Sequence, residues 1–189
     1  MQDAFAIFDL SHHPWLDEDK LREEYHRRSA TTHPDVGGDA EEFIKLHRAY
    51  RTIRHPDDRL RHLLELEAPE LLAQTRPIPP ALADQFMKIG AARKSCLTFL
   101  AKYRAATSPL ARALCAGEIN AQRLAVSKIR DSLASGQAHA LARIAAFGAN
   151  WRDHLSEVAT VHDELSYLSK WSKEMHELSL ELSIASDPI

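Results

Sequence analysis

Prolines divide this sequence into helical segments, and their positions constrain the fold more than any other feature. The first long helix begins at Asp17, a good N-cap residue, and must end by His33, because Pro34 disfavours helical geometry in the residue before it. Asp39 opens the next helix, which ends at Pro56. Two helices separated by a short glycine-containing loop are therefore predicted in the first third of the chain, after a short apolar helix over 3–10.

The second half of the sequence predicts three longer helices. The stretch 68–80 contains four prolines and marks a boundary. A helix over 81–106 follows, and Ser108-Pro109 opens another, since proline suits the first helical position. Ser135-Gly136 is a candidate break in that helix. The last helix spans 151–183.

The last helix has the most regular apolar pattern, with steps of three and four residues that lengthen near its end. Such a seam requires partner helices, which the preceding segments supply, although an intermolecular coiled coil is the alternative. We therefore predict an all-α fold with an N-terminal helical hairpin and a C-terminal three-helix bundle. The seam residues are Val158, Val161, Leu165, Leu168, Met175 and Leu182.

Composition excludes several classes of function. With 24 lysines and arginines against 27 acidic residues, the net charge of −3 argues against nucleic-acid binding. No apolar run approaches the roughly 20 residues of a membrane helix, and the acidic N-terminus does not resemble a signal peptide. Cys96 and Cys115 are expected to be buried or idle thiols in a reducing cytosol, so we expect a cytoplasmic protein without membrane contact.

The eleven histidines show no zinc-ligand spacing, and no catalytic or nucleotide-binding motif is present. We therefore expect no bound metal, no cofactor and no enzymatic activity.

The tripeptide His-Pro-Asp occurs twice, at His33-Pro34-Asp35 and at His55-Pro56-Asp57. The first lies between two amphipathic helices, where a rigid hairpin can hold a few polar side chains at its tip. The second follows the hairpin, where proline ends one helix and aspartate can cap the next. We assign a function to the first tripeptide and a structural role to the second.

Residues 3–66 resemble a J-domain. The resemblance rests on DAFAIFDL as the first helix, Leu21 and Tyr25 as core positions of the second, His33-Pro34-Asp35 as the loop, and AYRTIRHPDDR as the end of the third. RHPDDRLRHLLELEAPELL, followed by a helical C-terminal half, is similar to the HscB (Jac-type) branch. The resemblance implies a J-domain over 1–68, a linker over 69–80 and a client-binding helical bundle over 81–185.

This family resemblance implies a co-chaperone. The loop residues His33, Pro34 and Asp35 would dock on the nucleotide-binding domain of a DnaK/HscA-class chaperone and promote ATP hydrolysis there. A carboxylate such as that of Asp35 can accept charge-assisted hydrogen bonds from an arginine of the partner.

The resemblance also implies a basic face on the second helix that meets an acidic surface of the chaperone. Arg22, His26 and Arg27 occupy the matching positions, with a solvated helix face as the alternative. Arg28 and Thr32 depart from the family pattern, which has an apolar residue and an aromatic there. We expect less packing beneath the loop as a result.

In HscB proteins the C-terminal bundle binds the scaffold protein on which iron–sulfur clusters are assembled. Phe86, Met87 and Tyr167 match the apolar and aromatic client-binding positions, although Phe86 and Met87 also suit a helical core. The sequence departs from the family at Gly90, Ala91 and Lys94. A J-domain protein with a different client, and a helical adaptor whose J-like hairpin does not stimulate a chaperone, are the alternative functions.

Overall fold

The computed structural model describes residues 2–186, which contain helices and no strands, so the predicted all-α class is confirmed. The chain divides into two compact units. Unit 1 comprises the described residues up to Arg76 together with Ala140–Ser166. Unit 2 comprises Pro77–His139 and the described residues from Tyr167 onward. The border after Arg76 lies within the predicted linker, but 140–166 packs in the unit of the N-terminal helices.

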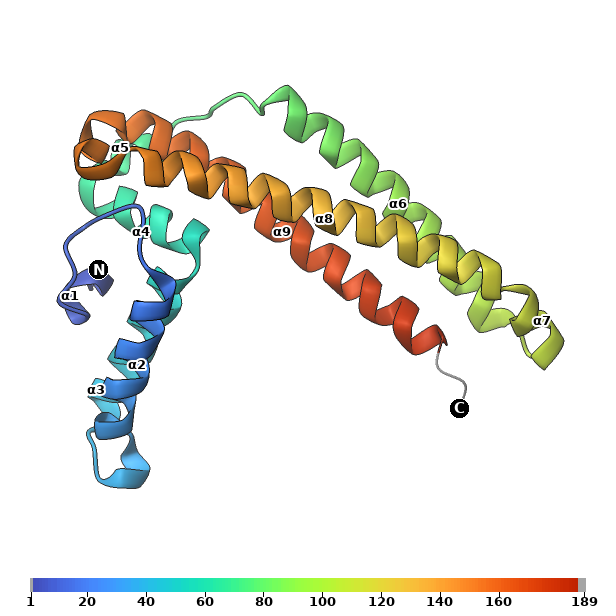
Figure 1. Ribbon diagram of the computed structural model, residues 1–189, viewed down its shortest axis with the longest axis horizontal. Coiled ribbons are helices and arrows are strands. Elements are labelled where there is room, and N and C mark those ends of the chain that lie inside the picture. The colour runs from blue at the N-terminus through green and yellow to red at the C-terminus, as the bar shows by residue number, and fades with distance from the viewer. Residues whose placement is uncertain (1, 187–189) are drawn as a thin grey trace. The chain divides into compact units, whose positions relative to one another are not determined.

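Unit 1 contains the hairpin that the sequence predicts. Helices α2 and α3 lie side by side in opposite directions, and the chain turns between them at a free end (Figure 1). Each of these helices begins where an aspartate side chain accepts backbone N–H groups of the first turn. Asp17 accepts from Lys20 at 3.1 Å, and Asp39 accepts from Glu41 at 2.7 Å. The elements are α1 (Ala4–Ile7), α2 (Glu18–Thr32), a 3-10 turn (Pro34–Val36), α3 (Ala40–Arg54), α4 (Pro56–Glu67) and α5 (Pro69–Leu72).

Two apolar clusters hold unit 1 together. The first joins α1, α2 and α3 to α4 and to Trp151, which lies in the 3-10 segment Gly148–His154. In the second, Leu60 and Leu64 of α4 pack against residues of 140–166. Burying each such leucine contributes about 2 kcal/mol. The first cluster consists of Ala4, Phe5, Phe8, Leu21, Leu46, Ala49, Tyr50, Ile53, Leu63 and Trp151.

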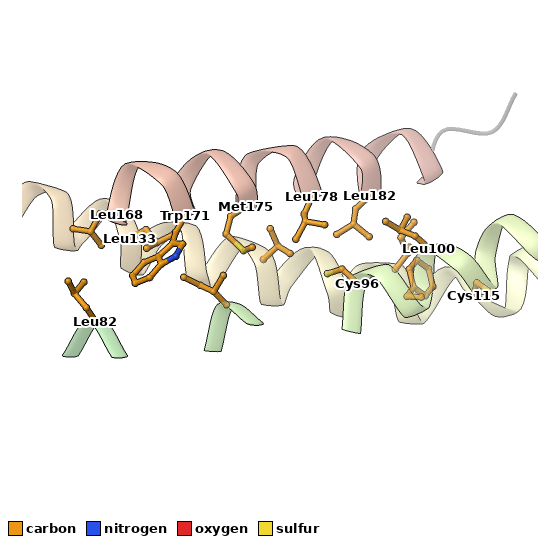
Figure 2. Close-up of a cluster of buried hydrophobic side chains, with 14 residues drawn as sticks. Leu82, Cys96, Leu100, Cys115, Leu133, Leu168, Trp171, Met175, Leu178 and Leu182 are labelled. Carbon is orange, nitrogen blue, oxygen red and sulfur yellow. The ribbon is translucent and has the colours of Figure 1, made fainter. Parts of the chain in front are cut away.

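Unit 2 is built from three long helices and one short helix: α6 (Pro80–Ala105), α7 (Pro109–Leu114), most of α8 (Ala116–Ala146) and the second part of α9 (Leu155–Ser186). Figure 2 shows Trp171, Met175 and Leu182 of α9 pointing toward side chains of α6 and α8. All six predicted seam residues of α9 are buried within the chain. The first three belong to unit 1 and the last three to unit 2.

The two cysteines are buried in unit 2, as the sequence indicated. Burial raises the pKa of the Cys96 thiol. A thiol with a raised pKa is a poor nucleophile, which suits a packing role for Cys96.

The prediction of a helix break at Ser135-Gly136 is wrong, because α8 continues through both residues. A Cβ at Gly136 would lie 3.4 Å from both methyl groups of Leu168, so glycine there permits close packing of α8 against α9. The helix is interrupted earlier, at Cys115 between α7 and α8. The last helix also begins later than predicted, at Leu155, because the preceding residues form a 3-10 segment with a kink at Asn150.

Candidate functional site

The turn at the tip of the hairpin is closed by backbone hydrogen bonds. The N–H groups of Val36 and Gly38 both donate to the carbonyl of His33, each at 3.1 Å. Gly37 has a φ of 82°, in the left-handed region that favours glycine. Gly38 passes so close to the end of α2 that a Cβ there would lie 2.3 Å from the carbonyl carbon of Thr32. Gly38 is therefore required for this close approach, and Gly37 suits the left-handed backbone of the turn.

The turn exposes the tripeptide at its surface. The side chain of Asp35 is 87% exposed and that of His33 is 42% exposed, and Pro34 is exposed as well. The Asp35 backbone N–H donates to Nδ1 of His33 at 3.2 Å. Because Nδ1 accepts this bond, a neutral His33 ring carries its proton on Nε2. The turn thus presents an N–H donor and a carboxylate acceptor to a partner.

A series of ring contacts, which we call the ring column, links this turn to the interior of the hairpin. The ring of His33 packs edge-on against Phe43, with centroids 4.7 Å apart, and Phe43 lies 6.4 Å from His47. The Tyr25 hydroxyl oxygen is 3.1 Å from Nδ1 of His47. Tyr25 then stacks on Tyr50, with centroids 4.0 Å apart. The ring column thus restrains the orientation of the His33 ring through its contact with Phe43 of α3.

The two residues that depart from the J-domain pattern have defined roles. Arg28 contacts Glu24 and donates to the carbonyl of Ile7 at 2.6 Å and to Asp9 at 2.7 Å, so it ties α2 to α1. Thr32 donates its hydroxyl to the carbonyl of Arg28 and lies beside a depression of about 350 Å³. The ring column, whose residues come mainly from α3, supports the turn on its other side.

The three predicted basic residues of α2 lie on its surface, but two of them are paired within the helix. Arg22 contacts Asp19 at 2.8 Å, and Arg27 contacts Glu24 at 2.6 Å. Hydrogen bonds from Arg27, and then from Arg28, lower the pKa of Glu24 to about 2. His26 is exposed beside Tyr25. These pairs reduce the net positive charge that α2 presents.

Two polar side chains of α4 that the sequence did not single out are buried. Arg59 donates to the carbonyl of Pro14 at 3.0 Å and to that of Ile53 at 2.9 Å, and burial lowers the pKa of its guanidinium to about 10. His62 accepts the Ala4 N–H at 3.0 Å. The ring of His62 is buried and stacks on that of Phe5, with centroids 5.9 Å apart.

In unit 2 the predicted client-binding residues lie at the surface. Phe86 and Met87 are 58% and 70% exposed, so neither is a core residue. Phe86 of α6 and Tyr167 of α9 both approach Trp171, with ring centroids 6.2 and 5.6 Å apart. Trp171 is not among the residues predicted from the sequence, although its spacing of four residues from Tyr167 places both on one face of a helix. The three departures on α6, at Gly90, Ala91 and Lys94, are exposed too.

Residues 2–186 contain no group of three or more histidines, cysteines or acidic residues arranged to hold a metal ion. None of the helices in this range is long and apolar enough to cross a bilayer.

Taken together, the hairpin with its exposed turn and the long helices that follow define an HscB-like all-α fold. The solved structure of Chaperone HscB from Vibrio cholerae is similar to this chain, with a TM-score of 0.62 and 18% sequence identity. The match covers 96% of this chain and 99% of that chain. At this identity the likeness establishes the fold alone. No family model matches the sequence.

Proposed function

We propose that this protein is a J-domain co-chaperone that stimulates the ATPase of a DnaK/HscA-class chaperone and delivers a client to it. The observation that carries the proposal is the exposed His33-Pro34-Asp35 turn, held at the end of a helical hairpin by two glycines and the ring column. The HscB-like fold supports the same role. The protein itself performs no catalysis in this proposal.

The chemistry of the turn suits docking on a charged protein surface. The Asp35 carboxylate can accept two hydrogen bonds from an arginine of the chaperone, and the Nε2–H of His33 can donate a third. Proline fixes the backbone φ between them. Because the turn is already ordered, docking costs little conformational entropy. Binding one conformation of the chaperone better than another shifts its population toward ATP hydrolysis.

Arg22, His26 and Arg27 contribute to encounter in this proposal. Their exposed positions on α2 suit contacts with an acidic surface, which mainly affect the rate of association and its salt dependence. Because Arg22 and Arg27 already pair with acidic side chains of α2, we expect each to contribute less than the turn does.

Single-turnover ATP hydrolysis by DnaK and HscA tests the main proposal. Adding the protein should raise the hydrolysis rate, and Asp35→Asn or His33→Gln should abolish the increase while leaving the circular dichroism spectrum unchanged. Asp57→Asn is the matched control, since it makes the same change in the second tripeptide and should retain stimulation. Stimulation that survives Asp35→Asn would favour the adaptor alternative.

For the client, we propose the iron–sulfur scaffold protein, bound at Phe86, Met87 and Tyr167. The exposure of Phe86 and Met87 supports this, because large apolar side chains outside the core suit a protein contact. Calorimetry with the full chain should detect scaffold binding that is weakened about tenfold by Phe86→Ala with Met87→Ala. Leu124→Ala on α8, where the side chain is 57% exposed, is the control. Absence of scaffold binding would point to a different client.

A further inference from the structure

The surface arginines of unit 1 fall into two groups. Most of them contact a carboxylate, and such pairs neutralise the charge that each arginine offers to a partner. These pairs are Arg22 with Asp19, Arg27 with Glu24, Arg28 with Asp9, Arg61 with Glu65, Arg76 with Asp163, Arg143 with Glu164 and Arg152 with Glu67.

The C-terminal half of α3 is different. Arg48 and Arg51 are exposed, lie one helical turn apart, and make no side-chain hydrogen bond or ion pair with the described residues. Arg51 and Arg54 lie in the last turn of α3, where a cation is favourable beside the carboxyl end of a helix. That explanation does not extend to Arg48, which lies nearly two turns before the end.

Arg48, Arg51 and His55 line a shallow depression of about 400 Å³, together with Thr52 and Asp58. The Thr52 hydroxyl donates to the carbonyl of Arg48 at 3.1 Å, so its proton is not offered to a ligand. Asp58 is the one acidic residue of the lining, and burial, followed by the charge of Asp57, raises its pKa. Two guanidinium groups against one carboxylate leave the depression positive.

We propose that this surface, formed by Arg48, Arg51 and His55 and called here the α3 basic face, binds a carboxylate-rich peptide segment of a protein partner. Guanidinium groups bind carboxylates through two parallel hydrogen bonds. Arg48 and Arg51 lie one turn apart, which corresponds to about 5–6 Å between Cβ atoms on a helix. Acidic residues three or four apart on a partner helix, or two apart on an extended strand, have a similar spacing. A segment with several carboxylates can pair each arginine with its own carboxylate, and the link between the two contacts strengthens binding.

The limited extent of the patch favours a peptide over a nucleic acid. Nucleic-acid binding depends on many phosphate contacts, whereas this face offers two arginines and a histidine on a chain with a net charge of −3. The face is also distinct from the His33-Pro34-Asp35 turn, since Arg48 lies nine residues beyond Asp39, about 14 Å along the axis of α3. The inference therefore goes beyond the proposed function and does not depend on it.

Fluorescence anisotropy of the full chain with a labelled deca-glutamate peptide at low salt tests the proposal. The wild type should bind saturably, and Arg48→Gln with Arg51→Gln should weaken binding about five- to tenfold. Arg93→Gln with Arg104→Gln is the matched control, because it removes the same charge from arginines that already pair with Glu174 and Glu181. The control should change binding less than about twofold.

Three results would overturn the proposal: no saturable binding by the wild type, equal losses in the two double variants, or tighter binding of a short DNA duplex through Arg48 and Arg51. A charge-reversal variant, Arg51→Glu, gives an independent check, since it should lose deca-glutamate binding while its circular dichroism spectrum stays helical. No chaperone is present in this assay, so its outcome is separate from that of the ATPase test.

Discussion

The two His-Pro-Asp tripeptides share three residues but differ in what the chain does after the aspartate. After Asp35 the helix ends within one turn, at Gly37, and the side chains stay exposed. After Asp57 the helix continues as α4 and buries Arg59 and Leu60. In both places proline occupies the first helical position, so the tripeptide itself is a helix start. The residues that follow decide whether it becomes an exposed turn or part of a core.

Arg59→Ala has the largest expected effect and tests the core that follows the second tripeptide. It removes a buried cation that donates to the carbonyls of Pro14 and Ile53, and it leaves a cavity, so the free energy of unfolding should fall by about 3–5 kcal/mol. Arg61→Ala, which removes an exposed arginine paired with Glu65, should change it by less than about 1 kcal/mol. Urea unfolding of both variants measures the difference. Equal losses would mean that the region after the second tripeptide does not depend on Arg59.

Gly38→Ala tests the exposed turn that follows the first tripeptide. The added Cβ overlaps the backbone of Thr32, so the turn must move, at a cost of about 2 kcal/mol in the free energy of unfolding. Under the proposed function, Gly38→Ala should also stimulate ATP hydrolysis by the chaperone less than the wild type does. Gly117→Ala, where a Cβ meets nothing within 4 Å on α8, should be neutral or slightly stabilising. Unchanged chemical shifts at residues 33–38 in Gly38→Ala would contradict the close approach.

Phe43→Ala tests whether the ring column supports the exposed turn, and its expected effect on stability is smaller. The half-buried ring supports His33 and contacts His47, so its removal should cost about 1 kcal/mol and loosen the turn. Hydrogen exchange at the amides of Val36 and Gly38 should accelerate about fivefold. Ile44→Ala, at the neighbouring and 49% exposed position, should leave these amides unchanged. Similar exchange in the two variants would exclude the ring column as the support of the turn.

Acidification should affect the region of α4 through His62. Burial lowers the pKa of His62, while the nearby charges of Asp3 and Glu65 act to raise it and that of His12 to lower it. Since the folded pKa lies below the unfolded value of about 6.5, this contribution to stability is complete above about pH 6.5 and is lost as the pH falls toward the folded pKa. Protonation of His62 also removes the acceptor of the Ala4 N–H.

Hydrogen exchange between pH 7 and 5, corrected for the intrinsic rate, measures this effect. The Ala4 amide should lose protection on acidification. His62→Gln, whose side-chain oxygen accepts a hydrogen bond without titrating, should remove that pH dependence. The same profile in the variant would assign the loss to another group. This is the smallest of the four effects, because it concerns one hydrogen bond.

Features that depend on neighbouring residues could be predicted from the sequence, and features that depend on distant ones could not. Asp17 and Asp39 begin helices as expected, because a cap is satisfied within three residues. The close approach of α8 to α9 at Gly136 involves Leu168, which is 32 positions away, so the residues around the glycine gave no sign of it. The burial of Arg59 likewise depends on carbonyls at Pro14 and Ile53.

The candidate site shows the same division. The exposed turn could be placed because helices, proline and glycines define it locally. The pairing of Arg27 with Glu24 was visible in principle as an i, i+3 spacing, yet its effect on the charge of α2 became clear only from the contacts. The ring column and the approach of Phe86 to Trp171 require two helices each, so they emerged only from the structure.

The contribution of α8 and α9 to both compact units determines how this molecule can be dissected. A fragment that starts near residue 80 would retain Val158, Val161 and Leu165 without Leu60 and Leu64, the leucines that cover them. Such a fragment would expose an apolar stripe and tend to self-associate, and a fragment ending near residue 76 would lose its cover in the same way. Point substitutions in the intact chain are therefore the sound way to assign functions to its parts, and proteolytic pieces are expected to remain associated after the cut.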